Sequence, residues 1–334
     1  MVEMRALGDS GLMVTRMGLG MAALGRPGYI TLGHAEDLGR RYDVAAMELH
    51  AHAVLDVAWD AGLRYFDAAR SYGRGEEFLG SWLRARGIDP AACTVGSKWG
   101  YTYTADWRVD AEVHEIKDHT LPTLQRQFAE SRERLGDYLD LYQIHSATED
   151  SGVLDRPEVL DELARLKASG AVRAVGLTLS GPDSARTLER AFAIQRDGRR
   201  LFDSVQATWN VLESSLGPLL ARVREAGMGV IVKEALANGR LTPRNTDPAF
   251  SASRAVLERE AARLGCTIDQ LALAAVLDQP WVDCVLSGAA TVEHLRSNVA
   301  ALDVHLDEPA RAALASLAEP PERYWAARAA LPWQ

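Results

Sequence analysis

Eight short runs rich in β-branched and apolar residues recur along the chain, and most are followed by a longer amphipathic pattern. The runs lie near residues 20, 66, 96, 142, 175, 206, 231 and 285. Short strands that alternate with helices predict a parallel sheet, because parallel strands need a crossover between them. Eight such units in 334 residues favour a closed (β/α)8 TIM barrel of the α/β class, and we predict one domain over residues 1–334.

The helical patterns between these runs end at glycines, which accept the left-handed backbone that follows a helix. The clearest patterns are residues 48–62, 120–136, 156–170 and 214–227. In the first of them, the side chains of Leu49, Val54, Leu55 and Ala58 are expected on one buried face.

Three segments fall outside the repeat of strands and helices. Residues 4–16 contain the turn signal GDSG and predict an N-terminal β-hairpin across the barrel floor. Residues 25–47 form a long insertion, interpreted as either a lid or a contact in a homo-oligomer. The C-terminal tail, PPERYWAARAALPWQ, is rich in aromatic residues.

Composition excludes several classes of protein. The net charge of −9 argues against a nucleic-acid partner. Three widely separated cysteines give neither a disulfide framework nor metal-ligand spacing, so we expect a reduced, cytoplasmic protein without a metal. No signal-peptide pattern and no apolar run of about 18 residues is present, so no membrane partner is expected.

Polar residues stand at the ends of several predicted strands, where (β/α)8 barrels place their chemistry. Asp67 ends the second strand in FDAARSYG, Tyr72 follows in the next loop, Lys98 ends the third strand, and His145 ends the fourth. We expect Asp67 to pair with Lys98, and the ammonium of Lys98 to lower the pKa of the Tyr72 phenol. His145 can orient a substrate oxygen. The set predicts acid–base catalysis on a carbonyl or alcohol oxygen.

These segments, together with GSKWG, YLDLYQIH, VQATWN and LSGAATVEHLRSNVAAL, make the chain resemble the aldo-keto reductase superfamily over nearly its whole length. The resemblance places the four catalytic residues on Asp67, Tyr72, Lys98 and His145. It implies hydride transfer between a nicotinamide cofactor and a small carbonyl or alcohol substrate, with Tyr72 as general acid and base. An aldehyde, a ketone or a sugar would be the carbonyl compound.

The same resemblance implies where the cofactor binds. The expected contacts are Thr178, Gln206, Lys233, Gly288, Ala289, His294 and Asn298. A helix beginning near Thr291 would direct its N–H groups at the pyrophosphate. NADP(H) is the first expectation, with NAD(H) as the alternative, because Ala290 and His294 stand where many NADP-dependent members carry Arg or Lys. Lys233 and Glu234 depart from the family pattern, and Lys233 could bind phosphate, pair with Glu234 or face the substrate.

The loops supply an aromatic set that predicts the lining of the substrate pocket. Its members are Tyr29, Trp99, Tyr101, Tyr103, Trp107, Tyr324 and Trp325. Two other functions remain alternatives at this point: a cofactor-binding regulatory barrel with slow turnover, and a lyase or isomerase that uses Lys98 to form a Schiff base.

Overall fold

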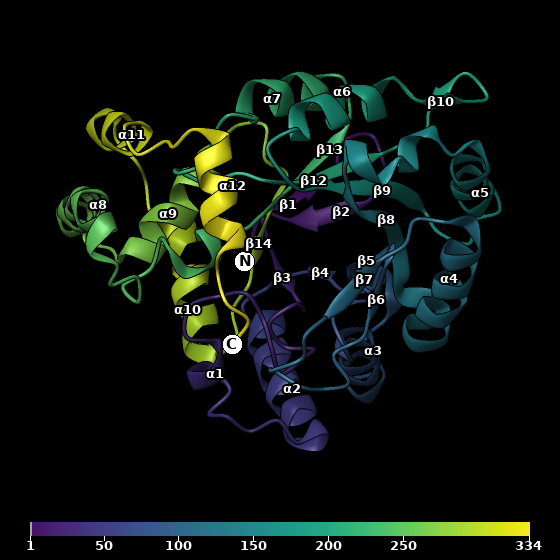
Figure 1. Cartoon of the computed structure of the whole chain (residues 1–334), viewed down its shortest axis with the longest axis horizontal. Coiled ribbons are helices and arrows are strands. Elements are labelled where there is room, and N and C mark those ends of the chain that lie inside the picture. Colours follow the sequence, from purple (N-terminus) through teal and green to yellow (C-terminus); the bar gives the residue numbers. More distant parts are fainter. Residues whose placement is uncertain (1) are drawn as a thin grey trace.

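The computed structural model describes residues 2–334, and its eight parallel strands close into a barrel. Around the barrel the order of strands is β12-β13-β14-β3-β4-β5-β8-β9, and Figure 1 shows them at the centre of the molecule, inside the helices. The strands are β3 (Met17–Gly20), β4 (Tyr65–Asp67), β5 (Thr94–Trp99), β8 (Leu139–Ala147), β9 (Ala174–Leu179), β12 (Ser204–Thr208), β13 (Gly229–Lys233) and β14 (Cys284–Ser287). The predicted (β/α)8 class is confirmed.

Helices follow the strands along the chain and cover the outside of the barrel (Figure 1). They are α1 (His34–Asp37), α2 (Val44–Asp60), α3 (Gly75–Ala85), α4 (Leu121–Leu135), α5 (Pro157–Ala168), α6 (Ser184–Ala193), α7 (Gly217–Glu225), α8 (Ser251–Leu264), α9 (Ile268–Leu277), α10 (Val292–Ala300), α11 (Glu308–Ala315) and α12 (Pro321–Ala329). The glycines expected to end α2, α4, α5 and α7 all have positive φ, from 58° to 92°. Within residues 2–334, no helix is long and apolar enough to cross a membrane.

One expectation about α2 is wrong. Leu49 is 71% exposed, whereas Val54, Leu55 and Ala58 are buried. At 3.6 residues per turn, Leu49 lies about 180° around the helix from Ala58, so the two cannot share a face. The apolar residue that faces the barrel in this part of the helix is Met47.

The N-terminal hairpin closes the bottom of the barrel, as predicted. Strands β1 (Met4–Ala6) and β2 (Met13–Thr15) pair antiparallel. Leu7 and Leu12, from the turn between them, are fully buried in a cluster with Tyr65 and Ile231 from the barrel strands. A methyl group on Gly8 would lie 2.3 Å from the backbone nitrogen of Gly229, so the turn fits tightly against β13.

Three added segments lie at the strand ends where the polar residues gather. The loop after β3 contains α1, and α2 begins at Val44, so the insertion expected over 25–47 is shorter than predicted. The loop after β5 forms a second hairpin from β6 (Tyr101–Tyr103) and β7 (Glu115–Lys117). After α12, the backbone of Gln334 exchanges two hydrogen bonds with that of Tyr29, which joins the tail to the first loop.

A last hairpin, β10 (Gln195–Arg196) with β11 (Arg199–Arg200), follows α6.

Candidate active site

Asp67 is the centre of the polar cluster inside the barrel mouth. Its side chain is almost completely buried, and Lys98 donates a hydrogen bond from Nζ to Oδ1. The other carboxylate oxygen, Oδ2, accepts hydrogen bonds from the Tyr65 hydroxyl at 3.0 Å and from Gln206 Nε2 at 2.9 Å. Lys98 also donates to the carbonyl of Ala68 at 2.8 Å. The expected Asp67–Lys98 pair is therefore present, and partners on three strands hold it rigidly.

Tyr72 and His145 lie next to this pair and face the cavity of the barrel mouth. The Nζ atom of Lys98 is 4.7 Å from the centre of the Tyr72 ring. The His145 ring meets the Tyr72 ring edge to face, with 5.5 Å between centres. The structure thus brings together all four residues that the sequence predicted.

The pKa of Tyr72 departs from the expectation. Burial raises the pKa of the phenol above its usual value, and the negative charge of Asp67 raises it further. The positive charge of Lys98 is offset by its ion pair with Asp67. The pKa of the phenol is therefore raised, and not lowered by Lys98 as we expected. Tyr72 is consequently protonated at neutral pH.

His145 is neutral under the same conditions. Burial lowers its pKa well below the usual value, and the positive charges of Lys98, Lys233 and Arg26 lower it further. Its backbone carbonyl accepts a hydrogen bond from Nε2 of His119 at 2.9 Å, which fixes the position of the strand end. A neutral imidazole in this place can donate one hydrogen bond to a substrate oxygen.

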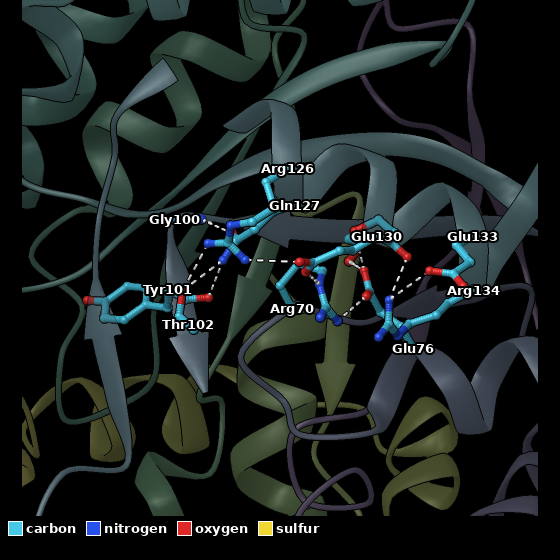
Figure 2. A network of polar contacts seen from close by, with 12 residues as sticks. Arg70, Glu76, Gly100, Tyr101, Thr102, Arg126, Gln127, Glu130, Glu133 and Arg134 are labelled. Atoms are coloured by element: carbon cyan, nitrogen blue, oxygen red, sulfur yellow. Dashed lines mark hydrogen bonds and ion pairs between the residues drawn. The ribbon is translucent and has the colours of Figure 1, made fainter. Parts of the chain in front are cut away.

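A buried polar network holds the loop that carries Tyr72 (Figure 2). Arg70, two residues before Tyr72, donates to Glu76 at 2.7 Å and to Glu130 at 2.9 Å. The Glu76 carboxylate also accepts hydrogen bonds from Ser97 and Ser131, both at 2.6 Å. These contacts join the loop to α3, β5 and α4.

The network continues to the β6–β7 hairpin through α4. Gln127 accepts a hydrogen bond from the backbone N–H of Gly100 and donates one to the carbonyl of Tyr101, at 2.8 and 2.9 Å. Arg126 joins Glu130 to Thr102 (Figure 2). The Tyr72 loop and the hairpin are therefore fixed to the same helix.

A cavity of about 540 Å³ extends from this cluster to the N-terminus of α10. Asp67, Tyr72, His145 and Gln206 line one end. The other end is lined by Gly288, Ala289, His294 and Asn298, the residues for which the resemblance implies cofactor contacts. Asn298 donates to the Ser287 hydroxyl at 2.9 Å, and Thr291 caps α10 by accepting from the N–H of His294.

This lining fits an extended dinucleotide. The space around Gly288 is open, since a methyl group there would meet no atom within 4 Å, so the backbone of this loop is accessible. The cavity volume is within the range of cofactor sites, about 300 to 1,000 Å³. The N-terminus of α10, nine residues long, suits a pyrophosphate, because helix N-termini attract anions.

Lys233 and Glu234 form an ion cluster with the C-terminal helix. Glu234 has a positive φ of 55° and lies 3.6 Å from Lys233 Nζ. Arg328 of α12 donates to both carboxylate oxygens of Glu234, from Nε at 3.0 Å to each oxygen. Burial alone would raise the pKa of Glu234, but Arg328 and Lys233 lower it to about 2. Lys233 is thus paired with Glu234, and it also lines the cavity, so binding of phosphate or of substrate by Lys233 stays a prediction.

Several expected site residues lie outside the cavity. Thr178 is buried beneath it, and its hydroxyl accepts from the N–H of Ser146 at 2.7 Å. Trp99 is adjacent to Lys98 in a strand, so its side chain points to the opposite face, into the core. Neither Thr178 nor Trp99 lines the cavity, contrary to the expectation that Thr178 contacts the cofactor and Trp99 the substrate.

The other aromatic residues divide between the cavity and its surroundings. Tyr29 lines the cavity, as expected. Tyr101 packs against the His145 ring, with 5.0 Å between the ring centres, but it does not line the cavity. Trp107 and Tyr103 lie in a separate hollow, and Trp325 packs edge to face on the buried Tyr324.

Sequence reasoning missed eight charged or aromatic residues in the cavity wall: Arg26, Asp37, Glu115, Arg244, Asp269, Glu293, Arg328 and Trp333. Arg244 forms an ion pair with Asp37 and lies 3.3 Å from Nε2 of His294. Four of the eight come from irregular loops, the second hairpin or the tail, where periodicity gives no signal, and the other four lie on helices, where a polar residue that faces a cavity follows the same pattern as one that faces solvent. The aromatic content of the tail was the available hint for Trp333.

Comparison with known proteins agrees with this arrangement. The model of the Aldo/keto reductase family matches residues 16–319. The chain is 28% identical over 343 residues to the NADH-specific methylglyoxal reductase of Escherichia coli (strain K12), an alignment that covers 95% of this chain and 98% of that protein. It is 29% identical to the L-galactose dehydrogenase of Arabidopsis thaliana, with 90% and 88% covered.

Solved structures show the same fold. Aldo-keto reductase AKR11C1 from Bacillus halodurans (holo form) aligns with a TM-score of 0.74 at 22% identity, covering 96% of this chain and 97% of that chain. At this identity the likeness concerns the fold alone.

Proposed function

The chain belongs to the aldo/keto reductase family, and on that premise we propose that Tyr72 is the general acid with which this NAD(P)(H)-dependent oxidoreductase reduces a small carbonyl compound. The observation that carries the proposal is the shared placement of Tyr72 and His145 on the cavity wall, with the buried Asp67–Lys98 pair beside them. A bound nicotinamide supplies the hydride in this reaction.

The side chains divide the remaining work. His145, kept neutral, donates a hydrogen bond that orients the substrate oxygen next to the Tyr72 hydroxyl. Tyr72 gives its proton to the oxygen as charge develops there, and its raised pKa keeps it protonated until that moment. Lys98, held by its hydrogen bond to Asp67, lies with Nζ 4.7 Å from the centre of the Tyr72 ring and helps to keep the ring in place.

The placement of Lys98 argues against the Schiff-base alternative. Its Nζ atom is almost completely buried, donates to both Asp67 and Ala68, and is not part of the cavity wall. A nucleophilic amine must reach the substrate, and the position of Nζ outside the cavity wall, held by Asp67, opposes this even though burial lowers the pKa of Lys98.

For the cofactor we propose Gly288, Ala289 and the α10 N-terminus as the pyrophosphate contacts, with His294 and Asn298 near the adenosine. Arg244 already carries the counter-charge of Asp37, which supports NADH over the NADPH expected first. The Escherichia coli relative is NADH-specific by name. A cytoplasmic location and a homo-oligomer remain predictions from the sequence.

The test is Tyr72→Phe, which keeps the ring and removes the proton. We expect kcat for aldehyde reduction to fall by about 10²- to 10⁴-fold, while cofactor affinity measured by fluorescence titration stays the same. Tyr138→Phe is the matched control, because that hydroxyl donates to the Ile88 carbonyl and Tyr138 precedes β8, at the opposite end of the strand from His145. If Tyr72→Phe reduces aldehydes at the parental rate, Tyr72 is not the acid. If the parent itself turns over very slowly although it binds cofactor, the regulatory alternative gains support.

A further inference from the structure

Arg26 is a buried cation in the cavity wall that the catalytic mechanism does not use. It follows β3, its side chain is 3% exposed, and three aromatic rings surround its guanidinium. The guanidinium carbon lies 5.3 Å from the ring centres of Tyr29 and Tyr72 and 4.8 Å from that of Trp333. These rings keep water away from the charge, which strengthens any interaction that the charge makes.

The hydrogen bonds of Arg26 leave part of its donor set unused. Nη1 donates to the carbonyl of Ser71 and to Oε2 of Glu115, both at 3.0 Å. Among residues 2–334, neither Nε nor Nη2 has a hydrogen-bond partner, and Nε is buried. Unpaired donors on a buried guanidinium are costly, so a ligand that accepts from them would bind favourably.

Around Tyr72 and His145 the charges leave one positive charge in excess, whereas Asp37, Arg244, Asp269 and Glu293 lie toward the other end of the cavity. The cations are Arg26, Lys98, Lys233 and Arg328, and the carboxylates are Asp67, Glu115 and Glu234. Four cations against three carboxylates give +1. The shift in the pKa of His145 shows that Arg26, Lys98 and Lys233 all act on the catalytic histidine. A ligand with a single negative charge would therefore balance the site.

We propose that Arg26 binds a carboxylate of the substrate, so that the enzyme acts on small aldehydes or ketones that carry a carboxylate. This inference rests on the proposed function and names its substrate class. A carboxylate accepts a charge-assisted hydrogen bond from Nη2, the donor that is neither paired nor buried among the described residues, and brings the one charge that the site lacks. A phosphate monoester, with nearly two charges, would exceed it.

Position supports the same assignment. Arg26 contacts the ring of Tyr72, so a substrate held by Arg26 has its carbonyl within reach of Tyr72 and His145. Glu115, on the β7 strand, is 25% exposed, and its bond to Nη1 neutralises part of the charge that Arg26 presents to a substrate. The carboxylate of Glu115 therefore weakens substrate binding, a consequence that a purely structural ion pair would not have.

The experiment measures kcat/KM for glyoxylate and succinic semialdehyde, each against its methyl ester. In the parent we expect the acid to be preferred by about 10- to 100-fold, as for a hydrogen bond between two charged groups. Arg26→Met should bring the ratio of acid to ester close to one. Glu115→Gln should raise the ratio by about 3-fold or more, because it removes the carboxylate that neutralises part of the charge of Arg26.

The opposite signs of the two variants separate recognition from structure. If Arg26 and Glu115 only brace the loop, both variants break the same pair and leave the ratio unchanged, which overturns the inference. A parent that prefers the esters also overturns it.

A binding measurement decides the question even if the proposed function fails and no aldehyde is reduced. Succinate, which has no carbonyl to reduce, is titrated into the full-length protein and followed by tryptophan fluorescence, since Trp333 stacks near Arg26. The inference expects a Kd at least about 10-fold weaker in Arg26→Met than in the parent. Equal affinities in the two proteins, or a signal that persists unchanged in Trp333→Phe, overturn it.

Discussion

The burial of His34 predicts a specific loss of stability in mild acid. His34 begins α1, its ring is fully buried against Tyr29, and neither ring nitrogen has a hydrogen-bond partner among the described residues. Burial lowers its pKa from 6.5 to about 4, although the Arg26 backbone and Asp37 act in the opposite direction. The nearby cations Arg26 and Arg244 add to the lowering.

The sign of the effect follows from proton binding. Between pH 6.5 and 4 the unfolded chain binds a proton at His34 and the folded protein does not. The contribution of His34 to the free energy of unfolding is therefore fully present above pH 6.5 and is lost as the pH falls toward 4. Each unit of pKa shift corresponds to about 1.4 kcal/mol. The full loss is about 3 kcal/mol, and about 2 kcal/mol of it occurs between pH 7 and pH 5.

The assay compares urea unfolding of the parent and of His34→Met at pH 7 and pH 5. The parent should lose about 2 kcal/mol more than the variant over this interval, because other groups titrate alike in both proteins. His305→Gln, at an exposed histidine, should follow the parent. A difference between parent and His34→Met below about 0.5 kcal/mol would refute the reasoning, since it would mean that His34 takes up its proton without opening the fold.

Two further predictions concern the cofactor end and the Tyr72 loop. Asp37→Asn frees Arg244 from its ion pair, so NADPH binding should strengthen relative to NADH binding by about 3- to 10-fold in fluorescence titrations. Glu36→Gln, at an exposed neighbour, is the control. An unchanged ratio of the two affinities would contradict the role given to Arg244. Glu76→Gln removes the buried negative charge that pairs with Arg70 and should lower the free energy of unfolding, measured in urea, by about 2 to 4 kcal/mol. Glu77→Gln, on the exposed side of α3, should change the free energy of unfolding little. Equal effects of the two substitutions would contradict the role of the network.

The features set by short-range periodicity could be predicted from the sequence. Asp67 ends β4, and Lys98 and His145 lie close to the ends of β5 and β8, as the apolar runs indicate. The register of a closed parallel barrel brings those ends together. The same periodicity, applied fully, would have excluded Trp99, because neighbouring strand residues point to opposite faces. It would also have excluded Leu49 from the buried face of α2.

Residues on irregular segments could not be placed in this way. Arg26 and Trp333 are 307 positions apart in the chain and meet only because the tail returns to the first loop. The direction of the Tyr72 pKa shift also depends on burial, which no local pattern reports. Hydrogen bonds between distant strands, such as that from Gln206 to Asp67, likewise appear only in three dimensions.

The separation between barrel and added segments bears on how such an enzyme can change its substrate. Asp67, Lys98 and His145 belong to strands whose neighbours fix them on both sides, whereas Arg26, Glu115 and Trp333 come from a loop, a hairpin and the tail. Mutations, insertions or deletions in those three segments alter recognition while hydride chemistry is preserved. Related enzymes can therefore evolve new substrate specificities through changes in these three segments. Mutant libraries confined to residues 25–41, 101–117 and 320–334 should yield new specificities with the smallest loss of active clones.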